Sequence, residues 1–133
     1  MRVETDRDLL RQTAASRRFG EVRLFRYAEQ FSETRQQQFS ATAFLLDSDT
    51  VYVAFRGTDN TLTGWREDFN LSFLPYVPSQ AAAAAYLRGI LSLGFSNVYV
   101  GGHSKGGNLA VYAAVQMQPE DFPRIRAVYN NDG

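Results

Sequence analysis

The chain has 133 residues, of which 44% are hydrophobic and 14% aromatic, and its fourteen basic side chains balance fourteen acidic ones. This size and composition suit one globular domain with its own hydrophobic core. Acidic residues are mixed among the arginines, so no basic patch tracks phosphates, and nucleic acid is excluded as the expected partner. We therefore predict a single soluble domain over residues 1–133.

Cysteine is absent, which excludes disulfides and thiolate metal sites, and His103 is the one histidine, which argues against a histidine-based metal site. Apolar runs stay well below the roughly 18 residues of a membrane-spanning helix. The acidic N-terminus does not have the features of a secretory signal. These features predict a cytoplasmic protein with no membrane span and no metal.

The first half of the sequence predicts a short helix followed by an antiparallel hairpin. The apolar stripe of this N-terminal helix consists of Leu9, Leu10, Thr13 and Ala14. Residues 21–31 and 39–46 have the aromatic and aliphatic content of strands, with a polar loop between them. The short polar turn at residues 47–50 leads directly into another strand, which predicts an antiparallel hairpin.

The second half alternates strands and helices. The predicted elements are a strand at residues 51–56, a long loop at 57–78, a helix at 79–93, a strand at 97–102, a helix at 104–117 and a strand at 124–130. Ser79 is the predicted N-cap of the first of these helices and Gly94 its C-terminal stop. Such alternation is typical of a parallel sheet with right-handed crossovers. We predict an α/β fold whose mixed sheet has an antiparallel hairpin followed by a parallel βαβαβ unit.

The stretch Gly102-His103-Ser104-Lys105-Gly106 joins a predicted strand to a predicted helix. A serine at such a sharp turn projects its hydroxyl from the sheet, and small residues two positions away on each side prevent collisions with the strand and helix. We therefore predict Ser104 as a nucleophile. The alternative is a glycine-rich turn in which Ser104 only caps the helix. A phosphate-binding loop is excluded because the lysine is followed by glycine and the glycine spacing differs.

A second motif, at residues 53–69, follows the strand that precedes the long loop. Gly57 and Thr58 end this strand, where their amides turn toward the mouth of the sheet. We predict that the amide of Thr58 pairs with the amide of Lys105 as two oxyanion donors. Asp68, after Trp65, is expected to return and accept hydrogen bonds from this loop. The alternative is a salt-bridged surface loop made of Arg56, Asp59, Glu67 and Asp68, and we favour a surface position for Arg66 and Glu67.

The stretches "VAFRGTDNTLTGWREDFNLSF", "GGHSKGGNLAVYAA" and "YNNDG" together resemble a family of uncharacterised bacterial lipase-like α/β-hydrolases related to class 3 lipases. The resemblance extends from about residue 19 to residue 133. It implies Ser104 as nucleophile, the amides of Thr58 and Lys105 as the oxyanion hole, and Trp65 with Asp68 as a pair supporting the loop. It also implies hydrolysis of carboxylic esters, acyl or lipid, without a metal or an organic cofactor.

The triad histidine is missing from this sequence. In such hydrolases the chain order is serine, acid, histidine, so the base belongs beyond residue 133. His103 precedes the nucleophile directly, so its side chain is expected on the other face of the strand. Lys105 is equally unsuited, because a residue adjacent to the serine rarely points at its hydroxyl. Asp132 is a candidate for the triad acid, although a turn role in Asn-Asp-Gly is the interpretation we favour.

We therefore interpret the chain as the central portion of a hydrolase, incomplete at its C-terminus, and expect little or no turnover from it alone. The alternative is a non-catalytic module that binds a lipid or a protein. Its motivation is the aromatic segment at residues 69–78, which is either a lid or binding surface or ordinary core packing. An open strand edge and apolar face further predict self-association of the chain.

Overall fold

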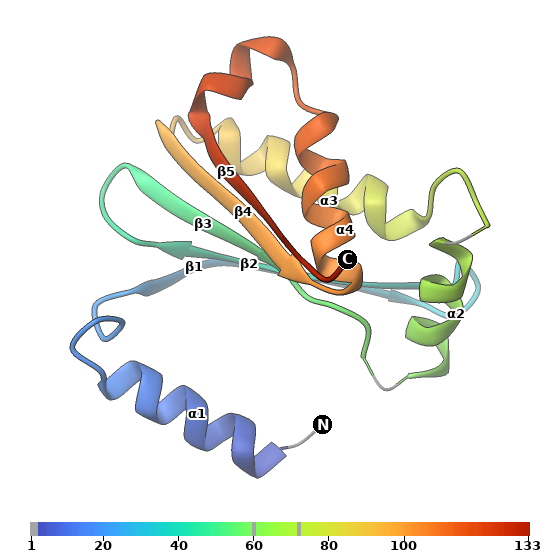
Figure 1. Ribbon diagram of the computed structural model, residues 1–133, viewed down its shortest axis with the longest axis horizontal. Coiled ribbons are helices and arrows are strands. Elements are labelled where there is room, and N and C mark those ends of the chain that lie inside the picture. Colours follow the sequence, from blue (N-terminus) through green and yellow to red (C-terminus); the bar gives the residue numbers. More distant parts are fainter. Residues whose placement is uncertain (1–2, 60, 72) are drawn as a thin grey trace.

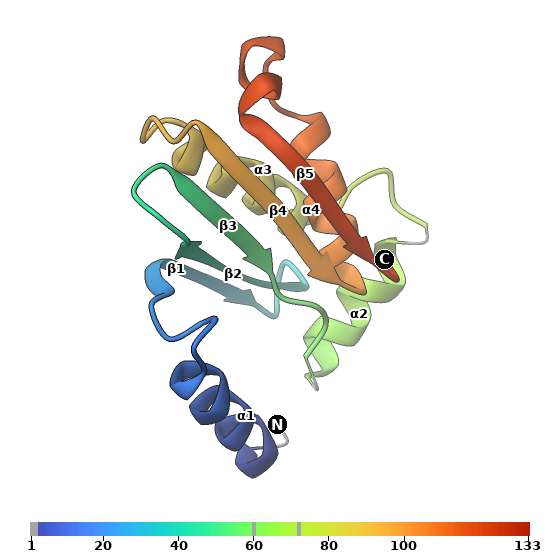
Figure 2. The same cartoon turned by 60° about the vertical axis from the view of Figure 1, so that its left-hand side comes forward.

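The computed structural model describes residues 3–59, 61–71 and 73–133, so Asn60 and Ser72 of the predicted loop lie outside the described residues. It contains one five-stranded sheet in the order β1-β2-β3-β4-β5. Figures 1 and 2 show helices α3 and α4 against one face of this sheet and α1 on the other side. In the described ranges no helix is both long and apolar enough to cross a membrane.

The first three strands form the predicted antiparallel part of the sheet. They are β1 (Arg23–Ser32), β2 (Gln37–Leu45) and β3 (Thr50–Phe55). β1 pairs with β2 and β2 with β3, both antiparallel, so the hairpin prediction is confirmed. In the turn between β2 and β3 the carboxylate of Asp47 accepts a hydrogen bond of 2.8 Å from the amide of Asp49, as short polar turns commonly do.

Strands β3, β4 (Asn97–His103) and β5 (Ile125–Asn131) are parallel neighbours. Helix α3 (Pro78–Leu91) connects β3 to β4, and α4 (Lys105–Val115), with a 3-10 helix at Pro119–Arg124, connects β4 to β5. The predicted α/β fold with a parallel βαβαβ unit is thus confirmed. The core lies between this sheet and the two helices, and its central side chains are Val51, Val53, Leu87, Ile90, Val98, Val100 and Leu109.

The predicted long loop at residues 57–78 is not a loop throughout, because it contains helix α2 (Leu62–Leu71). Helix α3 begins one residue before the predicted start, and its N-cap is Val77 instead of Ser79. Ser79 is fully buried inside the first turn. Gly94 follows the end of α3 with φ of 92°, a left-handed conformation that suits glycine, as predicted for a stop.

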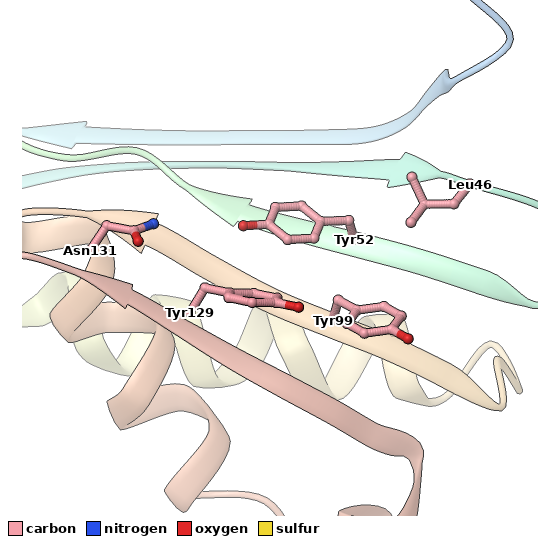
Figure 3. Close-up of a pocket in the computed structure, with 5 residues that line it drawn as sticks. All are labelled: Leu46, Tyr52, Tyr99, Tyr129 and Asn131. Atoms are coloured by element: carbon pink, nitrogen blue, oxygen red, sulfur yellow. The ribbon is translucent and has the colours of Figure 1, made fainter. Parts of the chain in front are cut away.

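The sheet face away from α3 and α4 is only partly covered. Helix α1 (Val3–Ala15) lies on that side, and Leu9 and Leu10 of its predicted apolar stripe are both 65% exposed. Figure 3 shows Tyr52, Tyr99 and Tyr129 projecting from three neighbouring strands on this face. The outermost strands, β1 and β5, are the edges of the sheet.

Candidate active site

Ser104 lies at the junction of β4 and α4 with φ of 55° and ψ of −132°. A positive φ is rare for a residue with a side chain and stores strain, which structures tolerate where the surroundings hold the residue in place. Here the amide of Ser104 donates to the carbonyl of Asn131 at 2.8 Å, and the Ser104 carbonyl accepts from the amide of Gly107 at 2.8 Å. This is the sharp strand-to-helix turn that the sequence predicts.

The two glycines that flank Ser104 are required by backbone contacts. A Cβ on Gly102 would overlap the backbone of Gly106, and a Cβ on Gly106 would overlap the carbonyl of Phe55. The end of β3 and the start of α4 therefore approach each other more closely than any side chain permits. The elbow, residues 102–106, is held by main-chain packing on both sides of its serine.

The segment after β3, residues 56–59, lies against the elbow, and because Thr58 is the predicted oxyanion donor we call it the oxyanion loop. A Cβ placed on Gly57 would be 2.8 Å from the carbonyl oxygen of His103 and 3.7 Å from Cβ of Ser104. The amide of Thr58 has no hydrogen-bond partner within the described part of the chain. Lys105 is the first residue of α4, so its amide has no intrahelical acceptor. Gly57 thus brings the segment that carries the Thr58 amide close to Ser104, and the Lys105 amide follows Ser104 directly in the chain.

The side chain of Lys105 is fully buried and points away from Ser104 into a polar cluster. Its Nζ donates to the carbonyl oxygen of Gln38 at 2.6 Å, to Oε1 of Gln38 at 2.7 Å and to Oε2 of Glu67 at 3.1 Å. Burial lowers the pKa of Lys105 below its usual 10.5, although the carboxylates of Glu67, Asp68 and Asp59 act in the opposite direction. The ammonium group uses all three of its donors.

Glu67 was predicted at the surface, and this was wrong, because its side chain is 0% exposed. Besides Lys105, Glu67 Oε2 accepts from the amide of Gln38 at 2.8 Å and from the hydroxyl of Ser79 at 2.8 Å. Its Oε1 accepts from the amide of Ser79 at 3.0 Å, in the first turn of α3. One carboxylate thus joins α2, β2, α3 and α4.

Asp59 closes the oxyanion loop from the other side. Its Oδ1 accepts from the amide and the hydroxyl of Thr61 at 2.9 Å and 2.5 Å, and its Oδ2 accepts from Arg56 at 3.2 Å. Burial alone would raise the pKa of Asp59, but the Thr61 hydrogen bonds, with Arg56 and Lys105, hold it below 3.8. The amide of Asp59 donates to Oε1 of Gln38 at 3.4 Å. Of the salt-bridged surface loop that we considered as an alternative, the contacts show one ion pair, between Arg56 and Asp59.

Trp65 and Asp68, the predicted supporting pair, do not form the principal anchor of this loop. Trp65 is 64% exposed, and Asp68 is half-buried. The neighbouring residue, Glu67, is the buried one, and it reaches the loop only through Gln38, whose Oε1 accepts from the Asp59 amide. Lys105 is the only lysine in the sequence, and it is fully buried here, where a lysine needs an acidic partner.

His103 and Asp132, the other ionisable candidates, are both exposed. His103 lies two residues after Gly101 and four after Tyr99, so its side chain belongs to the open face of β4. Asp132 follows β5 with φ of 60°, as in a turn. After it, the amide of Gly133 donates to Oδ1 of Asn130 at 3.0 Å, and a Cβ on Gly133 would be 2.6 Å from the amide nitrogen of Asn108. The last residue therefore lies beside the start of α4 (Figure 1).

Large apolar side chains are exposed on α2 and just after it. We call them the aromatic surface; its members, each at least half exposed, are Trp65, Phe69, Phe73, Leu74 and Tyr76. The rings of Phe69 and Phe73 are 4.8 Å apart. Because these side chains face solvent, ordinary core packing does not explain the segment. Over residues 3–59, 61–71 and 73–133, no group of three or more acidic or imidazole side chains is placed to hold a metal.

Comparison with known proteins agrees with this fold. No match was found among curated proteins. Among solved structures, a fungal lipase in complex with an inhibitor, presented as a model for interfacial activation in lipases, is similar with a TM-score of 0.53 and 17% identity. The alignment covers 77% of this chain and 44% of the lipase chain, so the chain spans less than half of that enzyme. The family profile described as Mbeg1-like matches residues 13–133. The chain therefore belongs to the Mbeg1-like family, which is lipase-like, and it has the α/β-hydrolase type of fold.

Proposed function

We propose that this chain carries the nucleophile and oxyanion hole of a serine hydrolase that acts on carboxylic esters of the acyl or lipid type. The observation that supports this most directly is the backbone of Ser104. A serine at φ of 55° between two glycines that tolerate no side chain is a costly arrangement. That cost is explained if the hydroxyl must project from the sheet beside free amides.

In the proposed reaction, Oγ of Ser104 attacks the ester carbonyl carbon. The carbonyl oxygen takes up the negative charge and accepts hydrogen bonds from the amides of Thr58 and Lys105. Collapse of this intermediate releases the alcohol and leaves an acyl-serine, which water then hydrolyses. These steps also need a base that takes the proton of Ser104 and returns it to the leaving alcohol, and no step needs an organic cofactor.

The proton of Ser104 needs a base that these residues do not provide. His103 is the only histidine and lies on the open face of β4. Asp132 remains a prediction for the acid, with a turn role as its alternative. We therefore expect the 133-residue chain alone to show at most the residual rate that comes from oxyanion stabilisation and binding.

The aromatic surface supports a lipid-like substrate. It comes after the oxyanion loop in the chain, and its side chains offer apolar area to an acyl chain or to a lipid aggregate. A substrate that is itself apolar would cover this area on binding, which would explain why these large side chains stay exposed on and after α2.

The test is labelling with a fluorophosphonate, which phosphonylates activated serines. The 133-residue chain, its Ser104→Ala variant and any longer natural reading frame that includes it are compared under identical conditions. We expect labelling that requires Ser104 and is fastest in a form that supplies a histidine base. If folded long and short forms both stay unlabelled, Ser104 is not an activated nucleophile and the proposal fails.

A second candidate function is a non-catalytic module that binds a lipid or protein through the aromatic surface. The observation in its favour is the place of His103 away from Ser104. Vesicle co-sedimentation separates the two. Binding that depends on Phe69 and Phe73, in a chain that no fluorophosphonate labels in any form, would favour the module over the enzyme.

A further inference from the structure

The Lys105–Glu67 pair is a buried ionic contact with no role in the steps above. Both side chains are 0% exposed, and their charged atoms are 3.1 Å apart. Taking two charges out of water costs more than their attraction often returns, and apolar pairs of the same volume can be as stable or more stable. Stability alone is therefore a weak reason for this pair, and its fixed hydrogen-bond geometry is the more informative property.

The cluster leads directly from the nucleophile to the oxyanion loop. Lys105 is the residue after Ser104, and its Nζ holds Oε1 of Gln38 at 2.7 Å. The same Oε1 accepts the amide of Asp59, the residue after Thr58, at 3.4 Å. Two hydrogen bonds to Gln38 therefore connect Lys105, which follows Ser104, with Asp59, which belongs to the oxyanion loop.

Glycine packing fixes the loop independently of this cluster. A Cβ on Gly64, in α2, would be 2.6 Å from Oδ1 of Asp59 and 3.3 Å from Cγ2 of Thr58 and from Oε1 of Gln38. The oxyanion loop thus rests directly on α2, the helix that also carries Glu67. Movement of α2 would carry the loop with it.

We propose that Glu67 is a positioning residue: by holding Lys105, Gln38 and α2 together, it sets the distance between the Thr58 amide and Ser104. This role rests on the proposed function, because it matters only if that amide receives an oxyanion. Glu67 does not touch substrate. It acts through Lys105 and Gln38, which hold the loop.

The variants are chosen to move the loop in two different ways. Glu67→Gln keeps the shape of the side chain and removes the charge that holds Lys105. Gly64→Ala keeps every charge and pushes on Asp59 and Thr58. The matched control is Ile90→Val, a buried core change on α3 that lowers the melting temperature without touching the cluster.

Two measurements are made on each variant, in the full 133-residue chain and in the longer frame used above. One is the rate of fluorophosphonate labelling at Ser104, well below the melting temperature. The other is the hydrogen-exchange rate of the Asp59 amide, together with the single side-chain resonance of Lys105, the only lysine. The second measurement does not depend on hydrolysis.

We expect Glu67→Gln and Gly64→Ala each to slow labelling about tenfold to a hundredfold, since an ångström of misplacement has effects of that size. Exchange at Asp59 should quicken in Glu67→Gln, and the Lys105 resonance should move. Ile90→Val should change neither rate. The double variant Lys105→Met/Glu67→Gln should regain most of the lost melting temperature but not the labelling rate.

The outcomes separate this proposal from the proposed function. If the parent chain is labelled and Glu67→Gln is labelled equally fast, the positioning role is overturned while the hydrolase stands. If the double variant regains labelling along with its melting temperature, the pair acts only on stability, and the proposal is also overturned. If no form is labelled, the hydrolase proposal fails, and the hydrogen-exchange rate of the Asp59 amide decides whether Glu67 positions the loop. An unchanged rate in Glu67→Gln overturns the positioning role, and a faster rate supports it.

Discussion

The two halves of the candidate site are held in different ways. The elbow is fixed by main-chain contacts, because Gly102 and Gly106 bring β3, β4 and α4 together with no space for side chains. The oxyanion loop rests on Gly64 of α2, and its Asp59 amide donates to Gln38, which the buried Lys105 and Glu67 side chains hold by hydrogen bonds. The elbow therefore depends on glycines that carry no side chain, whereas the polar cluster depends on the charges of Lys105 and Glu67.

This difference determines how each half responds to change. Steric packing is insensitive to pH and salt, and it fails only when a side chain is added. A buried ionic cluster is sensitive to the loss of either partner, because the charge that remains is left without compensation. Ser104 is thus held by packing alone, while under our proposal the Thr58 amide depends on a cluster that single substitutions can disturb.

The largest loss of stability is expected when the buried Lys105–Glu67 pair is broken. Lys105→Met leaves the carboxylate of Glu67 buried without its cation, so the free energy of unfolding should fall by about 3–5 kcal/mol. Urea unfolding monitored by circular dichroism measures this. Lys105→Met/Glu67→Gln should recover most of the loss, and a double variant as unstable as the single one would show that the charge itself is not the cause.

The close backbone packing at the elbow is tested by adding one methyl group. Gly106→Ala places a Cβ against the Phe55 carbonyl, and we expect a loss of about 1–3 kcal/mol, as for other overpacked sites. Gly89→Ala in α3 is the control, since its added Cβ would meet only the end of Arg26 at 3.9 Å. Equal stability of the two variants would contradict the close approach at the elbow.

If the backbone of Ser104 is strained, a variant that relieves this strain should be more stable than one that keeps it. Ser104→Gly and Ser104→Ala both remove the hydroxyl, but only glycine adopts a φ of 55° without strain. We expect the glycine variant to be more stable than the alanine variant by about 1 kcal/mol. Thermal unfolding of the pair decides this, and an alanine variant that is the more stable would contradict a strained elbow.

The smallest effect is the pH dependence of the oxyanion loop. Because the folded-state pKa of Asp59 lies below 3.8, its carboxylate stabilises the fold above that pH, and the contribution is lost as pH falls through the folded-state value. Asp59→Asn should remove this part of the acid dependence, which begins as pH falls toward 3.8 and ends below the folded-state pKa. Unfolding curves over this range measure it, and parallel curves for the two proteins would refute the assignment.

The elbow and the parallel sheet could be predicted from the sequence because their signals are local. Ser104 and its two glycines lie within five residues of each other, and the strand before them contains the apolar run Val98-Tyr99-Val100. The hairpin at residues 47–50 is equally local. The elbow, the turn and each single strand are recognised from residues that are close together in the chain, so a pattern in the sequence is sufficient to find them.

Helix α2 could not be predicted in the same way because its polarity is inverted. Its buried residues are Thr63, Gly64 and Glu67, while Leu62 and Trp65 face solvent. Methods based on apolar periodicity expect the opposite arrangement. The partner of Glu67 lies 38 residues away in the chain, so the pairing becomes visible only when α2 and α4 are placed side by side.

The position of Gly133 against the start of α4 affects how this protein can be handled. A purification tag or a fluorescent fusion joined after Gly133 would begin next to Asn108 and the carbonyl of Ser104. A fusion at the N-terminus would instead be joined at α1, on the opposite side of the sheet. Probes and affinity handles intended to leave Ser104 accessible therefore belong at the N-terminus.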